Sequence, residues 1–204
     1  MVQTNRGFNI LSNGENITPQ FWAPKMTSLY DASIPVLINI LKTTSSILAK
    51  GEDWAKQNGF ATSDLLELRV YHDMFPLKVQ VLIIINVTKK TLERLTGVAH
   101  PTIDDFDKTL EELYAFIDKT LEEAAAVGMR ESNERGDVQV SCEFFSKEYT
   151  SSLVNYVHGY AIPTVYFHLS ILYAILRGKG VPLGKWDYQT EFFKVFSPAS
   201  ETDT

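Results

Sequence analysis

IPTVYFHLSILYAILRGKGVPLGK, from Ile162 to Lys185, is the stretch of sequence that decides the fold. It is a long apolar run with a tyrosine and a histidine near its start, and it ends in a glycine-rich turn that contains lysine. A second string, HDMFPLKVQ from His72 to Gln80, places a histidine and an acid where another apolar run begins. Both strings predict long helices that carry polar side chains at a start or a bend.

Apolar residues at helical spacing predict four long helices joined by short connections. We expect them at about 28–56, 72–96, 103–126 and 150–178. A proline inside the last helix, Pro163, should kink it or split it in two. Four such helices are typical of an antiparallel all-α bundle.

Local signals refine these boundaries. Pro35 should start or kink the first helix, and Asp73 is expected to cap the second, with Pro76 tolerated in its first turn. Residues 129–147 alternate weakly in polarity, which favours a short strand pair or an ordered loop.

The chain is expected to divide into three parts. Residues 1–25 form a polar arm that is mobile or docks through its aromatic side chains. Residues 26–188 form the helical bundle, and residues 189–204 form a C-terminal tail that is partly disordered.

The second helix is apolar on both faces. Val81 and Ile84 share one face of it, whereas Leu82 and Asn86 lie on the opposite side. A helix that is apolar all round is buried all round. Either the N-terminal arm or a second subunit should cover its outer side, and we expect a homodimer.

Composition excludes several classes of protein. The net charge of −6 disfavours a nucleic-acid binder, since such surfaces need clustered lysine and arginine, and the short run at Lys89 and Lys90 indicates a solvated helix face. The single cysteine, Cys142, cannot form an internal disulfide, which fits a reducing compartment. No signal peptide is evident, and the longest unbroken apolar run, Val81 to Ile85, is far short of the ~20 residues of a membrane span. We expect a cytoplasmic protein with no membrane partner.

Four strings in order carry a family resemblance. They are SLYDAS (Ser28–Ser33), DMFPL (Asp73–Leu77), LTGV (Leu95–Val98) and YFH…LR..GVPLGK (Tyr166–Lys185). In this order and spacing the chain resembles an uncharacterised family of bacterial and fungal proteins within the DinB/YfiT-like helical-bundle superfamily. The resemblance implies an all-α, DinB-like four-helix bundle with a proline-kinked last helix.

The resemblance also implies a metal site, from which this chain departs. Many members of the superfamily look like metal proteins with three histidines, two of them at HxxxH spacing on the last helix. Here His158 and His168 are ten residues apart, which means ~15 Å of rise on a straight helix. Zinc needs its nitrogen ligands ~2.0–2.1 Å away. We therefore expect no metal ligands and no cofactor.

Histidines and tyrosines near the bends are the candidate catalytic residues. On a straight helix His158 shares a stripe with core residues, so it is either a hydrogen-bonded core histidine or a general base. His72 is either a surface residue or, with the helix start, a contact for an anionic oxygen. Tyr166 and His168 follow the Pro163 break, where ligands gather, although the tyrosine could equally be half in the core.

A second set of residues is expected to bind the substrate. Tyr173 shares a face with Tyr166, and so does Asn155 if the kink is mild. Gln80 and Trp186 complete the predicted substrate-binding set.

These residues favour a cofactor-independent enzyme that transfers protons on a small, apolar metabolite. Fungal relatives often lie beside polyketide-synthase genes, so the resemblance implies a cyclisation, lactonisation or dehydration of a polyketide-like substrate. GKGVPLGKW lacks the spacing of a phosphate loop, and the GxSxG, HExxH and dinucleotide fingerprints do not occur. A metal-dependent DinB-like transferase or hydrolase is one alternative. A non-catalytic binding or stress-response dimer is another.

Overall fold

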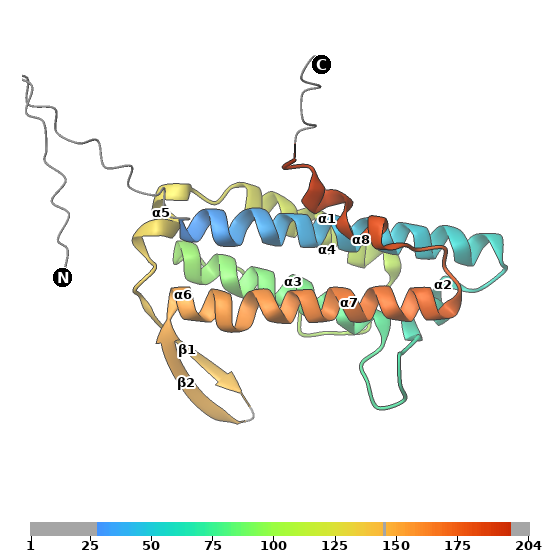
Figure 1. The fold of residues 1–204 in the computed structure, drawn as a ribbon. Coiled ribbons are helices and arrows are strands. Elements are labelled where there is room, and N and C mark those ends of the chain that lie inside the picture. The colour runs from blue at the N-terminus through green and yellow to red at the C-terminus, as the bar shows by residue number, and fades with distance from the viewer. Residues whose placement is uncertain (1–27, 145, 197–204) are drawn as a thin grey trace, which may run out of the picture.

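Four long helices run side by side in the structure, a computed structural model that describes residues 28–144 and 146–196 (Figure 1). They are α1 (Leu29–Gln57), α3 (Leu77–Thr96), α4 (Leu110–Ala125) and α7 (Ile162–Lys179). The predicted all-α four-helix bundle is confirmed. The predicted N-terminal arm, residues 1–25, and the end of the tail, residues 197–204, lie outside the described residues.

Shorter elements connect and flank the four long helices. In chain order they are α2 (Thr62–Glu67), α5 (Met129–Glu134), β1 (Gln139–Phe144), β2 (Lys147–Ser152), α6 (Leu153–Tyr156), the π-helical turn η1 (Val157–Ala161) and α8 (Lys185–Phe193). Helix α8 packs on α1 and crosses the predicted boundary at residue 188. An ion pair between Lys50 of α1 and Asp187 of α8 joins the two helices.

One hydrophobic core fills the space between the long helices. Ile40 of α1, Leu82 of α3, Leu113 of α4 and Leu172 of α7 are all fully buried. Complete burial of such a side chain stabilises a fold by about 1.5–3 kcal/mol. The bundle is therefore held mainly by apolar contacts among its own helices.

Helix α3 is buried on both faces by helices of the same chain. It packs against α7 and α4, with smaller contacts to α1, α2 and α5. Val79 and Val81, which point to nearly opposite sides, are both buried. The expectation that the arm or a second subunit must cover one face was wrong, because α4 and α7 do so. The homodimer stays a prediction, but the two apolar faces of α3 no longer support it.

Helix α1 begins before its proline. Ser28 caps it by accepting a hydrogen bond from the Asp31 backbone N–H at 3.1 Å, and the helix then continues through Pro35 to Gln57. Pro35 therefore does not start the helix, and this part of the prediction was wrong.

Helix α3 starts later than the sequence suggested. Its N-cap position is Pro76, which makes no side-chain cap, and not Asp73. Residues 69–76 instead form a loop, closed where the Leu77 backbone N–H donates to the Leu68 carbonyl at 2.9 Å. Proline prefers extended neighbours before it, so the helix cannot form across residue 75 as easily as after it.

Helix α4 also starts later than predicted, at Leu110 rather than near residue 103. The backbone of Ile103 is held away from helical geometry by the Asn86 side chain, which both accepts from its N–H and donates to its carbonyl, each at 2.9 Å. A capping box of Thr109 and Glu112 then starts the helix.

The last helix is distorted just before its proline. Helices α6 and α7 are joined by η1 into one rod (Figure 1), and Pro163 lies in the first turn of α7. The distortion predicted at Pro163 therefore takes the form of a π turn over Val157–Ala161 rather than a break.

A two-stranded hairpin projects from one end of the bundle (Figure 1). Strands β1 and β2 are antiparallel, with Gln139 opposite Ser152 and Cys142 opposite Tyr149. The sequence favoured a strand pair or a loop in this region, and the strand pair is present. Helix α5, which precedes it, was not predicted.

Two helical stretches are long and apolar enough to cross a membrane, Leu29–Gln57 and Leu153–Lys179. Core helices of soluble proteins meet the same criterion, and both stretches pack inside the bundle. They do not indicate a membrane protein.

Candidate functional site

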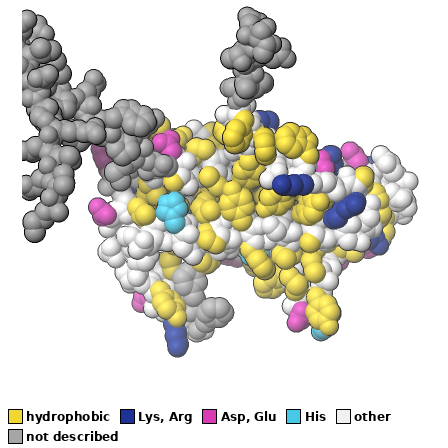
Figure 2. All heavy atoms as spheres, viewed as in Figure 1, with side chains coloured by type: hydrophobic (Ala, Val, Ile, Leu, Met, Phe, Trp, Pro, Cys, Tyr) yellow, Lys and Arg dark blue, Asp and Glu magenta, His cyan; other side chains and the backbone are white. Residues whose placement is uncertain are grey.

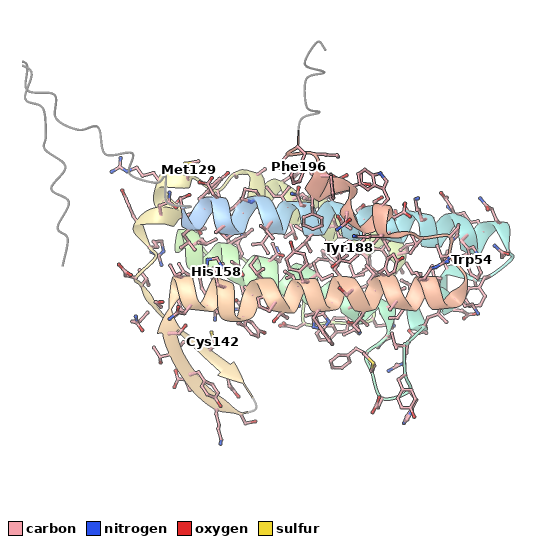
Figure 3. All side chains as sticks on the ribbon, in the orientation of Figure 1. Trp54, Met129, Cys142, His158, Tyr188 and Phe196 are labelled. Carbon is pink, nitrogen blue, oxygen red and sulfur yellow. The ribbon has the colours of Figure 1, made fainter. Side chains whose placement is uncertain are left out.

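His158, the first predicted catalytic residue, lies on the surface and not in the core. It is exposed on the π turn η1 and points away from the bundle interior (Figure 3). The prediction assumed a straight α-helix between His158 and Val165. A π turn holds one residue more than an α-helical turn, which rotates His158 by about 100° relative to α7.

His72 is also exposed, in the loop before α3. Its ring lies against that of Tyr71, with 4.4 Å between the centroids. It does not stand at the N-terminus of α3, so the structure does not bring it together with the other predicted residues.

The predicted tyrosines pack beneath α8. Tyr166 stacks on Phe192 at 5.8 Å between centroids, and Tyr173 donates a hydrogen bond to the Leu183 carbonyl at 3.3 Å. Burial raises the pKa of Tyr166, so its hydroxyl stays protonated at neutral pH. The two side chains form the layer between α7 and α8 rather than the wall of a cavity.

Asn155 and Trp186 are both exposed. Trp186 is 61% exposed and contacts Phe193 of the same helix. Figure 2 shows hydrophobic side chains gathered over α8 and the α1–α7 face next to it.

His168 and Gln80, both predicted as site residues, are in direct contact across the α3–α7 interface. The His168 Nδ1 lies 2.6 Å from the Gln80 Oε1. The Gln80 amide nitrogen donates to the Phe75 carbonyl at 2.8 Å, which fixes the orientation of the amide. Because Oε1 can only accept, Nδ1 of His168 must carry the proton. The lone pair of His168 is thus on Nε2.

The electrostatic state of His168 follows from its surroundings. The ring is half-buried, and this desolvation lowers the pKa of His168 to about 4. Gln80 is neutral and 2% exposed, so it orients the ring without adding charge. His168 is therefore an uncharged imidazole with a fixed tautomer at neutral pH.

The residues present do not fit the three-histidine metal site of the superfamily. Within residues 28–144 and 146–196, no three His, Cys, Asp or Glu side chains gather where they could hold an ion. His158 is exposed, and Nδ1 of His168 is engaged by Gln80. No metal-dependent step follows from these histidines.

Sequence reasoning missed a pocket between α3, the hairpin and the π turn. The pocket has a volume of about 250 Å³. It is lined by Asn86, Val87, Lys90, Arg94, Cys142, Glu143, Tyr156 and Tyr160. Cys142 is labelled on the hairpin in Figure 3, beside the helix that carries His158.

Arg94 is the central charged group of this pocket. Its guanidinium carbon lies 4.0 Å from the centre of the Tyr156 ring, and Nη2 donates to the Ser141 carbonyl at 3.0 Å. Burial raises the pKa values of Tyr156 and Tyr160, so both hydroxyls stay protonated. The pocket therefore presents positive charge and aromatic surface together.

The lysine pair on α3 was interpreted too simply as a solvated face. Lys89 is buried and pairs with Glu123 at 2.9 Å, whereas the neighbouring Lys90 lines the pocket. A usable signal was present, since Lys90 and Arg94 are four residues apart and so are Tyr156 and Tyr160. Each pair lies on one helix face.

Comparison with known proteins identifies the family. Residues 29–189 match the family described as a domain of unknown function, DUF1993. A crystal structure of a DinB family member from Shewanella denitrificans is similar, with a TM-score of 0.71 and 30% sequence identity over 78% of this chain and 90% of that chain. No curated protein matches. The chain therefore belongs to the DUF1993 family and has a DinB-like fold.

Proposed function

We propose that the protein is an enzyme that transfers a proton on a small, largely apolar metabolite, with His168 as the proton acceptor. The observation that carries the proposal is the fixed tautomer of His168, whose Nδ1–H is held by Gln80. A base must present a lone pair in a defined direction, and this arrangement leaves Nε2 with that lone pair.

The low pKa of His168 keeps the ring free to accept a proton and favours the return of that proton, although it also makes the ring a weaker base than an ordinary histidine. The ring is fully deprotonated at neutral pH, so no turnover begins with a blocked base. Once protonated on Nε2, a group with a pKa of about 4 is a strong acid. It would return the proton readily to a leaving hydroxyl or a developing oxyanion.

This chemistry supports the reaction type proposed from the family resemblance, a cyclisation, lactonisation or dehydration of a polyketide-like substrate. In a dehydration, His168 would take the proton next to a carbonyl and deliver it to the departing hydroxyl, which leaves as water. A cytoplasmic homodimer is part of the same proposal.

One observation favours the alternative of a non-catalytic binding protein. Tyr166, a predicted catalytic residue, is stacked against Phe192 and faces the α7–α8 layer. If His168 has no catalytic role, the molecule is better explained as a binding module.

Deuterium incorporation tests the proton-transfer step itself, whatever the final product of the reaction. The protein is incubated in ²H₂O with a panel of small β-hydroxy ketones and β-hydroxy thioesters, and NMR follows exchange at the carbon next to the carbonyl. We expect catalysed exchange for at least one compound, and a loss of ~10²-fold or more in His168→Gln. His158→Gln, on the same helical rod but exposed, is the matched control and should keep full activity.

Two results would contradict this proposal. One is catalysed exchange that His168→Gln leaves unchanged. The other is the absence of exchange across the whole panel with folded wild-type protein.

A further inference from the structure

The pocket between α3, β1 and the π turn is a second site, and we propose that it binds a small organic anion with an apolar body, such as a carboxylate. This site does not depend on the proposed role of His168. It lies at the other end of the α3–α7 interface, since Tyr160 is eight residues, or ~12 Å of helix, before His168.

Arg94 supplies the charge for the anion. Within the described part of the chain, no carboxylate lies within 4 Å of its guanidinium group. Arginine has five N–H donors, and the Ser141 carbonyl uses one of them. Several donors of a partly buried cation therefore remain for a ligand, in the fork geometry that suits a carboxylate.

A polar group beside Arg94 is also unsatisfied. Tyr156 is 3% exposed, and its buried hydroxyl has no hydrogen bond of good geometry, although Thr91 lies near it. An unpaired buried hydroxyl destabilises the fold, and a ligand atom or water can relieve that cost. The pKa of Tyr156 is raised by burial, so the group is a donor, as an anion requires.

The remaining walls fix the size and polarity of the ligand. Val87, Cys142 and the Tyr160 ring give an apolar lining, and Lys90 adds a second positive charge at the exposed edge. Glu143 is exposed and lines the pocket as its one acidic residue, so the lining carries a net charge near +1. A volume of about 250 Å³ lies just below the range of drug-sized ligands, ~300–1,000 Å³, and favours a small monoanion.

The backbone around the pocket is unusual for a structural element. The π turn Val157–Ala161 directly follows Tyr156 and contains Tyr160. Such turns occur frequently at functional sites. Here the turn sets the two tyrosine rings 5.6 Å apart on the side of Arg94.

Cys142 makes the proposal testable, because it is the only cysteine of the chain and lines the pocket. Iodoacetate and iodoacetamide alkylate a thiolate in the same way: sulfur bonds to the CH₂ carbon and iodide leaves. They differ in that iodoacetate is an anion. The ratio of the two rates, relative to the ratio for the same protein unfolded in urea, reports the local preference for an anion. The overall charge of −6 works against such a preference, so only local cations can produce it.

We expect the iodoacetate-to-iodoacetamide rate ratio to be about fivefold higher in the folded protein than in the unfolded protein. One nearby cation would give an effect of this size in water-like surroundings. Raised salt should reduce the preference. Arg94→Met should bring the ratio to the unfolded value, and Lys90→Met should lower it in part. Arg130→Met, whose side chain is exposed outside the pocket, should leave it unchanged.

Benzoate and benzamide complete the test as an anion and its neutral counterpart. Benzoate should protect Cys142 from iodoacetamide in a saturable way, and benzamide should not. Equal ratios in the folded and unfolded protein, or protection by benzamide as strong as that by benzoate, would overturn the proposal. Circular dichroism shows whether Arg94→Met folds. If it does not, the proposal is overturned when Lys90→Met keeps the whole iodoacetate preference of the wild type and benzoate gives no protection.

Discussion

Acid should destabilise this protein through His168 at pH values where most carboxylates are still ionised. The pKa of His168 is lowered from 6.5 to about 4 by burial. Between these two values the unfolded chain binds a proton at this position and the folded chain does not. The contribution of the neutral His168 ring to the free energy of unfolding is therefore present above pH 6.5, and it is lost as the pH falls from 6.5 toward 4.

The size of the effect follows from the two pKa values. Going from pH 7 to pH 5, a pKa of 6.5 in the unfolded state and about 4 in the folded state removes about 1.8 kcal/mol of unfolding free energy. The ring is only partly buried, so solvent screening reduces the expected loss to about 1 kcal/mol. Most carboxylates begin to titrate below this range, which separates their contribution.

Urea unfolding at pH 7 and pH 5 measures this loss directly. Wild type and His158→Gln should lose about 1 kcal/mol more than His168→Gln between the two pH values. NMR titration of the His168 ring in the folded protein gives an independent value for its pKa. A folded-state midpoint near 6.5, or an equal loss in His168→Gln, would refute the reasoning.

Two further substitutions test the packing and the helix starts. Glu123→Ala leaves the Lys89 ammonium, whose side chain is 6% exposed, without its 2.9 Å carboxylate partner, and should cost about 3 kcal/mol in urea unfolding. The neighbour Glu122, which has no such buried partner, is the matched control, and an equal cost for Glu122→Ala would contradict the role of the pair. Thr109→Ala removes the capping box of α4 and should lower the stability by about 1 kcal/mol in thermal unfolding. Thr109→Ser should restore most of it, and a failure of serine to do so would argue against capping.

Periodic apolar patterns were sufficient to predict the bundle, because long amphipathic helices have few ways to bury their apolar faces. The predicted ends of α1 and α3 were correct to within a residue or two, since Asn58 and Gly97 stop a helix by local chemistry. The predicted starts of α3 and α4 were both too early, and for α4 the reason is a contact between residues far apart in the sequence. Ile103 is held by Asn86, seventeen residues earlier in the chain, and no local pattern reveals that contact.

The candidate site was predictable only in part. His168 and Gln80 were both named from the sequence, but their contact spans 88 positions and depends on the register of α3 against α7. His158 was misplaced because one π turn changes the face on which it lies. Arg94 and Tyr156 were missed since each, taken alone, looks like an ordinary residue of an amphipathic helix.

The π turn also bears on how this family could tolerate changes in length. Gly159 faces open space, so a side chain in its place would meet no neighbouring atom within 4 Å of its Cβ. Removing one residue here would let Leu153–Lys179 form a regular α-helix and would rotate Tyr156 by about 100° away from Arg94. Because Leu153, Tyr156 and Val157 are core residues, the same rotation would turn them out of the bundle core and erase one wall of the pocket. Relatives that lack this residue should therefore lack both the anion site and this packing of α6 against the core.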